Sequence, residues 1–483
     1  MSNRSTSSKV VRNERLRKFG EEVGDWAGGS GPLYRQLSAA IARTVERGAV
    51  EPGSRLPAER ALSVALSVSR GTVIAAYDNL VAEGLLERHP GSGTYTIDVG
   101  RLALPAGREG SALVARLVDH SAGPGDAIDL SISVLHDAGA LPAAKVTTAE
   151  LASLTPDTGY SPWGLYNLRS IIADLLNKWG LPTRPEQVVI TTGAQQAISI
   201  AASCWVRPGD LVVVDDPTYP GAISAFTAAG AELLGVPVDQ SGVQVEPLRN
   251  ALNRRPALVY LQSALHSPTG VSLTRTRQEQ IAALLAEVRM PVVEDIALAG
   301  LIWCQAAPTL LAAAAPDEPI AVIGSLSKLL WGGLRLGFVR APEPVALRFA
   351  RVKATHDLGS SIVSQLLGTH ILRSPEWPTR ALARNEDLRS RCQLLTGRLR
   401  EALPTWQWTE PSGGLSLWVK LPTPTARPFA ELATRHGVTI ATADSLSATN
   451  GQEDRIRLSF APPADQLLRG VDRLAEAWTS HCR

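Results

Sequence analysis

A lysine that follows two hydroxyl side chains is the chemically most specific feature of this sequence. Lys328 ends the segment Ser325-Leu326-Ser327-Lys328, and Arg335 follows it seven residues later. A lysine amine can form a Schiff base with an aldehyde, and serine hydroxyls and an arginine guanidinium can bind a phosphate. Alone, a lysine in a serine-rich turn is usually just solvated. The set suits a phosphorylated aldehyde if other groups along the chain fit the same ligand.

Three further features fit a planar, phosphorylated ring. Asp295 ends an apolar run, where its carboxylate could pair with a protonated ring nitrogen. Tyr219 could stack on the ring. Gly193-Ala194-Gln195 follows an expected strand and opens an expected helix, so its backbone N–H groups could cradle a phosphate. Each signal is weak by itself, because an aspartate at a strand end is more often a helix cap and Tyr-Pro is often only a turn.

A small helical unit precedes these residues. Apolar residues recur at helical spacing from Leu33 to Val45 and predict a first helix. Pro57 lies near the first turn of a second helix. Ser69 is a plausible N-cap for a third helix that runs to Gly84. Segments 85–88 and 94–97 then flank a glycine-rich turn and predict a β-hairpin, or wing.

Two helices separated by a short turn suit docking in a DNA major groove, where the start of the second helix faces the base edges. Arg70 could make a bidentate contact to guanine. The whole set of candidate DNA contacts is Arg55, Arg60, Ser69, Arg70, Thr72 and, at the wing, Gly93. Residues 31–99 hold seven arginines and seven acidic residues, so the unit is not basic overall. On pattern alone, a helical protein-interaction domain fits equally well.

At 483 residues the chain is too long for one core. We expect a basic arm over residues 1–30, either solvated or in contact with phosphates, the helical unit over 31–99, and a linker rich in Gly, Ala and Pro over 100–127. From 128 to 483, β-branched runs alternate with amphipathic helices, which predicts an α/β domain with a mostly parallel sheet. The strand candidates are 188–191, 211–215, 257–262, 291–295 and 321–324.

Several classes of protein are disfavoured. The four cysteines are far apart, and neither they nor the histidines show metal-ligand spacing, so we expect no metal site and a reducing, cytoplasmic location. No long apolar stretch could span a bilayer, and the polar N-terminus lacks the apolar core of a secretory signal. The net charge of +2 does not by itself indicate nucleic acid binding.

The N-terminal unit resembles the winged helix-turn-helix of the GntR family. The motifs that carry the resemblance are Pro32-Leu33-Tyr34-Arg35-Gln36-Leu37, Gly53-Ser54-Arg55-Leu56-Pro57-Ala58-Glu59-Arg60, Val68-Ser69-Arg70-Gly71-Thr72-Val73, Tyr77-Asp78-Asn79-Leu80 and the Gly91-Ser92-Gly93-Thr94 wing. The resemblance implies a transcription regulator that binds operator DNA as a dimer.

Residues 128–480 resemble the fold-type I aminotransferases in the order of their motifs. That order is Tyr160 to Gly164, Gly193-Ala194-Gln195, Tyr219, Ser267-Pro268-Thr269-Gly270, Asp295, Lys328, Arg335 and Arg457. A GntR reader fused to such a domain resembles the MocR/GabR family of pyridoxal 5′-phosphate-dependent regulators.

The resemblance assigns a role to each of these residues. It implies that Lys328 carries pyridoxal phosphate as a Schiff base, that Asp295 pairs with the ring nitrogen and that Tyr219 stacks on the ring. The residues it assigns to the phosphate are Ser325, Ser327, Arg335 and the Gly193-Ala194-Gln195 turn, with Tyr160 reaching the phosphate of the partner subunit. Arg457 matches the arginine that clamps a substrate carboxylate.

Two positions depart from the aminotransferase pattern. Ser267 stands where the family commonly has an asparagine that bonds the cofactor phenolic oxygen, and its hydroxyl has a shorter reach. Leu298 stands where many aminotransferases have a tyrosine that contacts the same oxygen. We expect cofactor binding to survive these changes, whereas losing either contact should alter proton transfer.

These observations favour a cytoplasmic, DNA-binding regulator that senses pyridoxal phosphate or an amino-compound effector. The resemblance implies a head-to-tail homodimer. Two alternatives are a working aminotransferase that carries a DNA-binding module, and a DNA-binding protein whose large domain holds no cofactor. The joint presence of Lys328, Asp295 and Arg335 disfavours the last.

Overall fold

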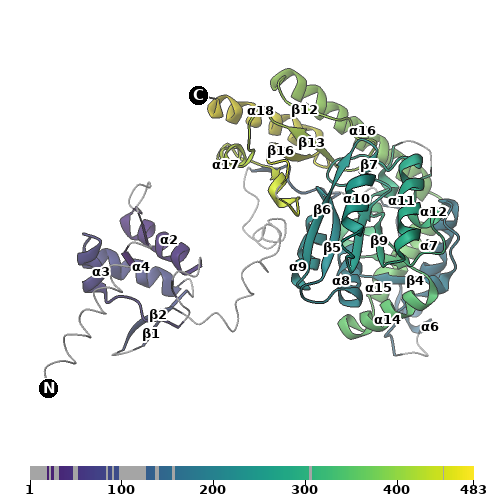
Figure 1. Ribbon diagram of the computed structural model, residues 1–483, viewed down its shortest axis with the longest axis horizontal. Helices are drawn as coiled ribbons and strands as arrows, with labels where there is room; N and C mark the ends of the chain where they lie inside the picture. The colour runs from purple at the N-terminus through teal and green to yellow at the C-terminus, as the bar shows by residue number, and fades with distance from the viewer. Residues whose placement is uncertain are drawn as a thin grey trace. The chain divides into compact units, whose positions relative to one another are not determined.

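The computed structural model divides into two compact units, Met1–Glu109 and Gly110–Arg483 (Figure 1). It describes residues 19–20, 23–24, 26, 32–46, 50, 53–82, 85–89, 92–96, 127–135, 141–154, 158–303, 307–449 and 451–482. Most of the predicted arm over 1–30, and nearly all of the predicted linker over 100–127, lie outside these ranges.

The first unit consists of helices and a hairpin. Its elements are α2 (Leu33–Glu46), α3 (Glu59–Ala65), α4 (Arg70–Ala82), β1 (Leu86–His89) and β2 (Gly93–Thr96). The two strands are antiparallel, with Leu86 opposite Thr96 and His89 opposite Gly93. The predicted hairpin is therefore present. Leu37, Ile41, Leu62, Tyr77 and Leu80, from α2, α3 and α4, are fully buried in its core.

The starts of α3 and α4 follow from local chemistry. The Ser69 hydroxyl accepts a hydrogen bond from the Thr72 amide at 3.0 Å, so the predicted N-cap is confirmed and satisfies one of the otherwise unpaired donors of α4. The second helix begins at Glu59 rather than beside Pro57, because Ala58 is extended (φ −61°, ψ 140°). The Pro57 carbonyl instead accepts the Tyr77 hydroxyl at 3.0 Å, which ties this turn to α4.

The second unit is built on an eight-stranded sheet with the order β4-β11-β10-β9-β8-β5-β6-β7. The strands are β4 (Val188–Thr191), β5 (Leu211–Asp216), β6 (Glu232–Asp239), β7 (Gly242–Val243), β8 (Leu258–Gln262), β9 (Val292–Asp295), β10 (Ile320–Ser325) and β11 (Gly337–Arg340). The five strands from β10 to β6 are mutually parallel. The predicted strands are all present, and the mostly parallel sheet is confirmed.

Strand β11 was not predicted, although it is central to the architecture. It runs antiparallel to both neighbours, β10 and β4. It has only four residues and follows the lysine segment after a single 3₁₀ turn, so no helix-length spacing separates it from β10. Such a short apolar run gives little periodicity from which to predict a strand.

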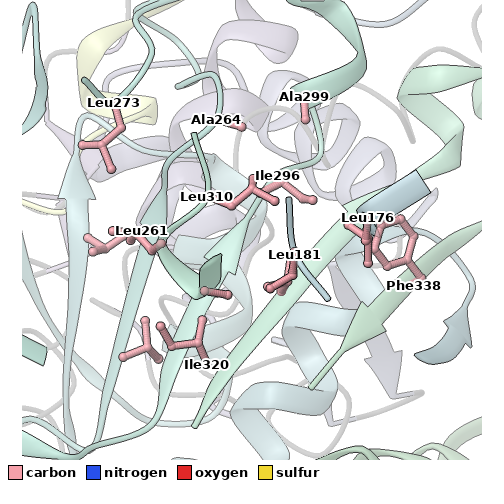
Figure 2. Packing of buried hydrophobic residues seen from close by; sticks show 14 of the residues in the cluster. Leu176, Leu181, Leu261, Ala264, Leu273, Ile296, Ala299, Leu310, Ile320 and Phe338 are labelled. Carbon is pink, nitrogen blue, oxygen red and sulfur yellow. The ribbon is translucent and has the colours of Figure 1, made fainter. Parts of the chain in front are cut away.

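Helices cover both faces of this sheet (Figure 1). One face packs against α7 (Tyr166–Lys178), α10 (Val245–Leu252), α11 (Arg275–Val288), α12 (Leu311–Ala314) and α15 (Ile362–Arg373). The other packs against α8 (Ala194–Trp205), α9 (Pro220–Ala228) and α14 (Glu343–Asp357). Figure 2 shows the first of these cores, in which Phe338 of β11 lies beside Leu176 of α7 and Leu261 and Ile320 belong to the same cluster.

Alternation along the strands decides which side chain meets which face. Val292 belongs to the core beneath α11, and Val293 belongs to the core beneath α8. Successive side chains of a strand point to opposite faces. Glu294 accordingly reaches α12, while Asp295 faces the opposite side at the end of the same strand.

The C-terminal part forms a smaller layer over its own core. Its elements are β3 (Ile128–Asp129), α16 (Trp377–Ala402), β12 (Gln407–Trp408), β13 (Ser416–Lys420), α17 (Arg427–Arg435), β14 (Val438–Thr439), β15 (Ala441–Thr442), β16 (Arg455–Ser459) and α18 (Ala464–His481). Four of the strands form a sheet in the order β12-β13-β16-β15, and β3 pairs with β14. A short helix, α6 (Thr148–Ser153), precedes the main sheet.

Replacing Glu294 with glutamine should lower stability. Glu294 is fully buried, and its carboxylate accepts the Leu311 amide at 2.5 Å, the Ala312 amide at 2.8 Å and the Ser263 hydroxyl. The amide nitrogen of Gln would oppose one of these donors, which should cost about 1–3 kcal/mol. Denaturant unfolding and amide exchange of residues 311–312 measure the loss. Glu287→Gln, which alters an exposed pair, is the control; equal unfolding midpoints for the two variants would contradict the account.

Candidate cofactor pocket and DNA-contacting face

The carboxyl ends of the parallel strands, together with the C-terminal layer, enclose a cavity of about 210 Å³. Ligands of open α/β sheets bind at this edge. Every predicted pocket residue except Tyr160 lies in its wall: Gly193, Ala194, Gln195, Tyr219, Ser267, Asp295, Ser325, Ser327, Lys328, Arg335 and Arg457. Residues separated by more than 260 positions in the sequence are thus brought to one site.

Lys328 lies in the short helix α13 (Leu326–Leu329), which begins as β10 ends. The Ser325 hydroxyl accepts the Lys328 amide at 3.3 Å, and the Lys328 amine donates to the Ser133 carbonyl at 2.6 Å. Burial, and then the charges of Arg457 and Arg335, lower the pKa of Lys328 to about 8, while Asp295 acts in the opposite direction. The amine is therefore closer to its nucleophilic, neutral form than an exposed lysine would be.

Asp295 is held by two donors. The Tyr260 hydroxyl donates to one carboxylate oxygen at 2.5 Å, and the Ala297 amide donates to the other at 2.7 Å. Burial raises the pKa of Asp295, whereas these hydrogen bonds and Lys328 favour the charged form. A bound cation, such as a protonated ring nitrogen, would also favour the charged form.

At the predicted phosphate turn, the backbone of Gly193 and Ala194 packs closely against the backbone of Gly337. Gly193 has φ +85° and is the N-cap of α8, whose first N–H groups are exposed by helix geometry to an anion. The Arg335 guanidinium donates to the Thr192 carbonyl at 3.1 Å. A Cβ at Gly337 would lie 2.6 Å from the Gly193 carbonyl carbon, so only glycine allows this approach.

Tyr219 lies near Gln195, the last residue of this turn, and both side chains are close to Gly221. Tyr219 is the N-cap residue of α9, and burial raises the pKa of its hydroxyl. The Gln195 amide donates to the Gly221 carbonyl at 2.8 Å, while its side-chain oxygen is buried without a partner among the described residues. That oxygen is a polar atom that a ligand donor could satisfy.

The two departures from the aminotransferase pattern both line the cavity. Gln262 donates to the Ser267 carbonyl at 3.1 Å and accepts the Ser267 amide at 3.1 Å, so the Ser267 backbone is clamped on both sides. The short Ser267 side chain replaces a longer amide. Leu298 presents an apolar side chain packed against the C-terminal core.

Arg457 and Tyr160 lie in different environments. Arg457 is 4 % exposed, lines the cavity and donates to the Ser131 carbonyl. Tyr160 is 64 % exposed and is absent from the cavity wall of its own chain. Its predicted contact with a partner subunit stays a prediction.

The first unit places the candidate DNA contacts around the start of α4. Arg70 is exposed, and its guanidinium lies 3.5 Å from the Glu59 carboxylate. The Ser69 and Thr72 hydroxyls lie 2.9 Å apart. At the wing, a Cβ at Gly93 would lie 2.7 Å from the Arg55 side chain, so Arg55 and Gly93 are adjacent. Arg60 is exposed on α3.

Sequence reasoning missed several supporting residues. Tyr260 is one of them. It lies two residues before Gln262, so it points to the same face of the sheet, and Gln262 is the register partner of Asp295 across β8 and β9. Strand alternation could therefore have identified Tyr260. Glu59 is another, since it also lies 3.4 Å from the Arg88 guanidinium. Nothing local marks Ser133, because only folding brings its carbonyl to Lys328.

Residues 125–474 match the aminotransferase class I and II family. The chain belongs to that family. Residues 33–96 match the gntR family of bacterial regulatory proteins, so a GntR helix-turn-helix domain is fused to an aminotransferase-like domain, which is the MocR-type architecture. Aminotransferases of this family depend on pyridoxal phosphate.

Relatives with the same architecture extend over nearly the whole chain. The uncharacterised HTH-type transcriptional regulator YdfD of Bacillus subtilis is 28 % identical over 462 residues, which cover 92 % of this chain and 95 % of YdfD. The HTH-type pyridoxine biosynthesis transcriptional regulator PdxR of Corynebacterium glutamicum is 29 % identical over 437 residues, covering 90 % and 93 % of the two chains.

A solved aminotransferase structure resembles the second unit. The α-aminoadipate aminotransferase LysN of Thermus thermophilus, in complex with N-(5′-phosphopyridoxyl)-L-leucine, is 26 % identical with a TM-score of 0.68. The match covers 78 % of this chain and 96 % of LysN.

The described residues contain no helix long and apolar enough to cross a membrane. Within the same ranges, His, Cys, Asp and Glu side chains nowhere gather in threes that could hold a metal ion.

The rate at which pyridoxal phosphate is captured covalently should follow the lowered pKa of Lys328. Since only the neutral amine attacks the aldehyde, the rate should fall about tenfold for each pH unit below 8 and level off above it. Arg457→Gln removes a cation that lowers this pKa, so its midpoint should move to higher pH. Stopped-flow absorbance on protein freed of cofactor measures the profile.

Arg249→Gln, at an exposed pair on α10, provides the matched control and should leave the profile unchanged. A wild-type midpoint near the ordinary lysine value would show that the cavity does not lower the pKa of Lys328.

Proposed function

We propose that this chain is a transcriptional regulator that binds operator DNA through residues 31–99 and senses pyridoxal phosphate, or an amino compound that reacts with it, through residues 128–483. The observation that carries the proposal is the convergence of Lys328, Asp295 and Arg335 on one cavity in a chain that also has a GntR domain. The location we infer is the cytoplasm, where operator DNA would be reached.

The cavity fits pyridoxal phosphate at both ends. The turn at Gly193, the Arg335 guanidinium and the two serines before Lys328 supply phosphate donors. At the other end, Asp295 is fixed by two hydrogen bonds and would hold a proton on the ring nitrogen. When bound, pyridoxal phosphate supplies an aldehyde that reacts with primary amines and a ring that withdraws electrons.

The remaining side chains have roles in orientation. Tyr219 would stack on the ring, and Lys328 would hold the cofactor covalently. Arg457 is buried at the cavity wall, where its guanidinium would bind the carboxylate of an effector. The effector class that fits is therefore an amine with a carboxylate, unless the cofactor alone is the signal.

Signal transfer requires that the ligand bind one arrangement of the protein more tightly than another. We infer a head-to-tail homodimer, in which Tyr160 of one subunit reaches the phosphate site of the other. Its 64 % exposure in a single chain supports this role, because an aromatic side chain that exposed is available for a partner.

A working aminotransferase is the second candidate, favoured by the lowered pKa of Lys328 and the placement of Arg457. Ser267 and Leu298 argue against efficient turnover. Ser267 is shorter than the asparagine, and Leu298 lacks the tyrosine hydroxyl, that aminotransferases commonly direct at the cofactor phenolic oxygen.

Arg70→Ala should weaken operator binding. A bidentate arginine–guanine contact discriminates by about 1–3 kcal/mol, so affinity for a site selected from random DNA should fall about 10- to 100-fold. Binding to unrelated DNA should change less. Fluorescence anisotropy at fixed salt measures both, with Arg249→Ala as the control outside the first unit. Equal losses on both DNAs would place Arg70 on the phosphate backbone instead.

Adding pyridoxal phosphate should produce a visible absorbance band and a borohydride-trapped adduct at Lys328. Lys328→Ala should lose both, whereas Lys420→Ala, which removes an exposed lysine, should keep them. Operator affinity should then change severalfold when the cofactor, or a carboxylated amine, is added to the intact protein, with a coupling of the usual size of about 1–3 kcal/mol.

Two results would overturn this function. If the intact protein shows no absorbance band and no trapped adduct when pyridoxal phosphate is added, the cofactor mechanism is excluded. Turnover of an amino acid with a keto acid at about 1 s⁻¹ or faster, with operator affinity unchanged by any ligand, would support the aminotransferase instead.

A further inference from the structure

The phosphate-binding turn is tied to the end of α14 by contacts that lie outside the cavity. The Thr192 amide donates to the Gln196 side-chain oxygen at 2.8 Å, and the Gln196 side-chain nitrogen donates to the Asp357 carboxylate at 2.6 Å. The Thr192 carbonyl accepts Arg335 at 3.1 Å. Both backbone groups of Thr192 are therefore held: Arg335 bonds its carbonyl from the cavity, and Gln196 bonds its amide from outside the cavity.

Asp357 is itself fixed by a buried cation. The Lys353 amine lies 2.7 Å from each Asp357 oxygen, and Lys353 is 0 % exposed. Although burial acts in the other direction, the hydrogen bonds from Gln196 and Lys353 keep the pKa of Asp357 below its usual value. A buried charge that loses its partner is strongly destabilised, so separating Lys353 from Asp357 would be costly.

The same carboxylate also holds the segment that packs on the loop after Tyr160. The Gly359 amide donates to Asp357 at 2.9 Å. Gly359 has φ +140°, and a Cβ there would lie 2.7–2.9 Å from backbone atoms of Ser161. The Ser360 hydroxyl returns to the Thr192 hydroxyl at 3.2 Å and closes the network.

We propose that Asp357 is a positioning residue that holds the phosphate-binding turn and the Tyr160 segment in a single arrangement, so that phosphate binding at Thr192–Gly193 and the contact of Tyr160 with a second copy of this chain are energetically linked. This inference rests on the proposed function, in which the turn binds the cofactor phosphate and Tyr160 reaches the partner.

The chemistry of the network supports the link. Asp357 receives donors from α8, from α14 and from the Gly359 turn, and each contact is 2.9 Å or shorter. Charge-assisted hydrogen bonds of this kind are about twice as strong as neutral ones. A shift of the turn must therefore move Gln196 and Asp357, and with them the Gly359 backbone against which Ser161 lies.

The test compares pyridoxal 5′-phosphate with pyridoxal, which has the same aldehyde but no phosphate. Gln196→Met cuts the link between Thr192 and Asp357 but leaves the Lys353–Asp357 pair intact. We expect this variant and Asp357→Asn to bind pyridoxal phosphate about five- to tenfold more weakly, the net size of one ordinary hydrogen bond. Affinity for pyridoxal should change less than twofold. The matched control is Asp239→Asn, because Asp239, on β6, is a carboxylate that pairs with Arg277 of α11.

Amide exchange provides a second measurement. If Asp357 had a purely structural role, replacing it would not change the difference in protection between the two ligands. In the wild type, pyridoxal phosphate should protect the amides of residues 160–165 more than pyridoxal does. Both variants should lose that difference. Because Asp357→Asn leaves a buried lysine without its anion, Gln196→Met decides the outcome if the first variant does not fold.

The outcomes separate the two proposals. If the wild type binds pyridoxal phosphate at Lys328 but both variants keep its preference over pyridoxal, the role of Asp357 is excluded while the proposed function stands. Equal weakening for both ligands would likewise exclude it, as a structural defect. If the wild type does not bind pyridoxal phosphate at all, the proposed function fails and this inference fails with it.

Discussion

The cofactor pocket depends on the close approach of Gly337 to the peptide between Gly193 and Ala194. This contact is possible only without a Cβ, and it places β11 in antiparallel register with β4, Gly337 opposite Thr191. The Leu336 carbonyl, one residue earlier, accepts the amides of Leu326 and Ser327. One short strand thus joins the lysine segment to the phosphate turn, and Arg335 is directed between them. If a larger residue separated these backbones, each pocket group would keep its chemistry but lose its position.

Strand parity then assigns the acidic groups to different tasks. Glu294 and Asp295 are consecutive and both buried in an apolar sheet, but they point to opposite faces. Glu294 stabilises the start of α12, whereas Asp295 faces the cavity with Tyr260 and Ala297 as donors. A buried carboxylate costs free energy unless donors satisfy it. Protein donors satisfy both carboxylates, but only Asp295 also faces the cavity, where a ligand could provide a further donor.

The differences from the aminotransferase pattern concern the part of the pocket where turnover is controlled. The groups that would retain a cofactor, at the phosphate turn, at Lys328 and at Asp295, are all present and mutually supported. Ser267 would weaken, and Leu298 would remove, the contacts that the aminotransferase pattern places at the phenolic oxygen. Retention without efficient proton transfer suits a sensor, because a sensor needs a stable occupied state. In the proposed regulator the GntR unit would supply the output, and its Arg70 and Arg88 both lie near Glu59.

The sequence by itself determined the type and order of the chemical groups. Lys328, Asp295, Arg335 and the Gly193 turn were predictable from the order of their motifs along the chain. The capped α4 and the hairpin were predictable from local patterns, because capping and strand alternation act within a few residues. The roles inferred for these residues remain predictions. Only the tertiary structure decided which distant groups complete the site. Tyr260 meets Asp295 through strand pairing, the Ser133 carbonyl meets Lys328 across 195 positions, and Asp357 reaches the phosphate turn across 161. Such contacts leave no periodic signal in the chain, since packing over long loops creates them.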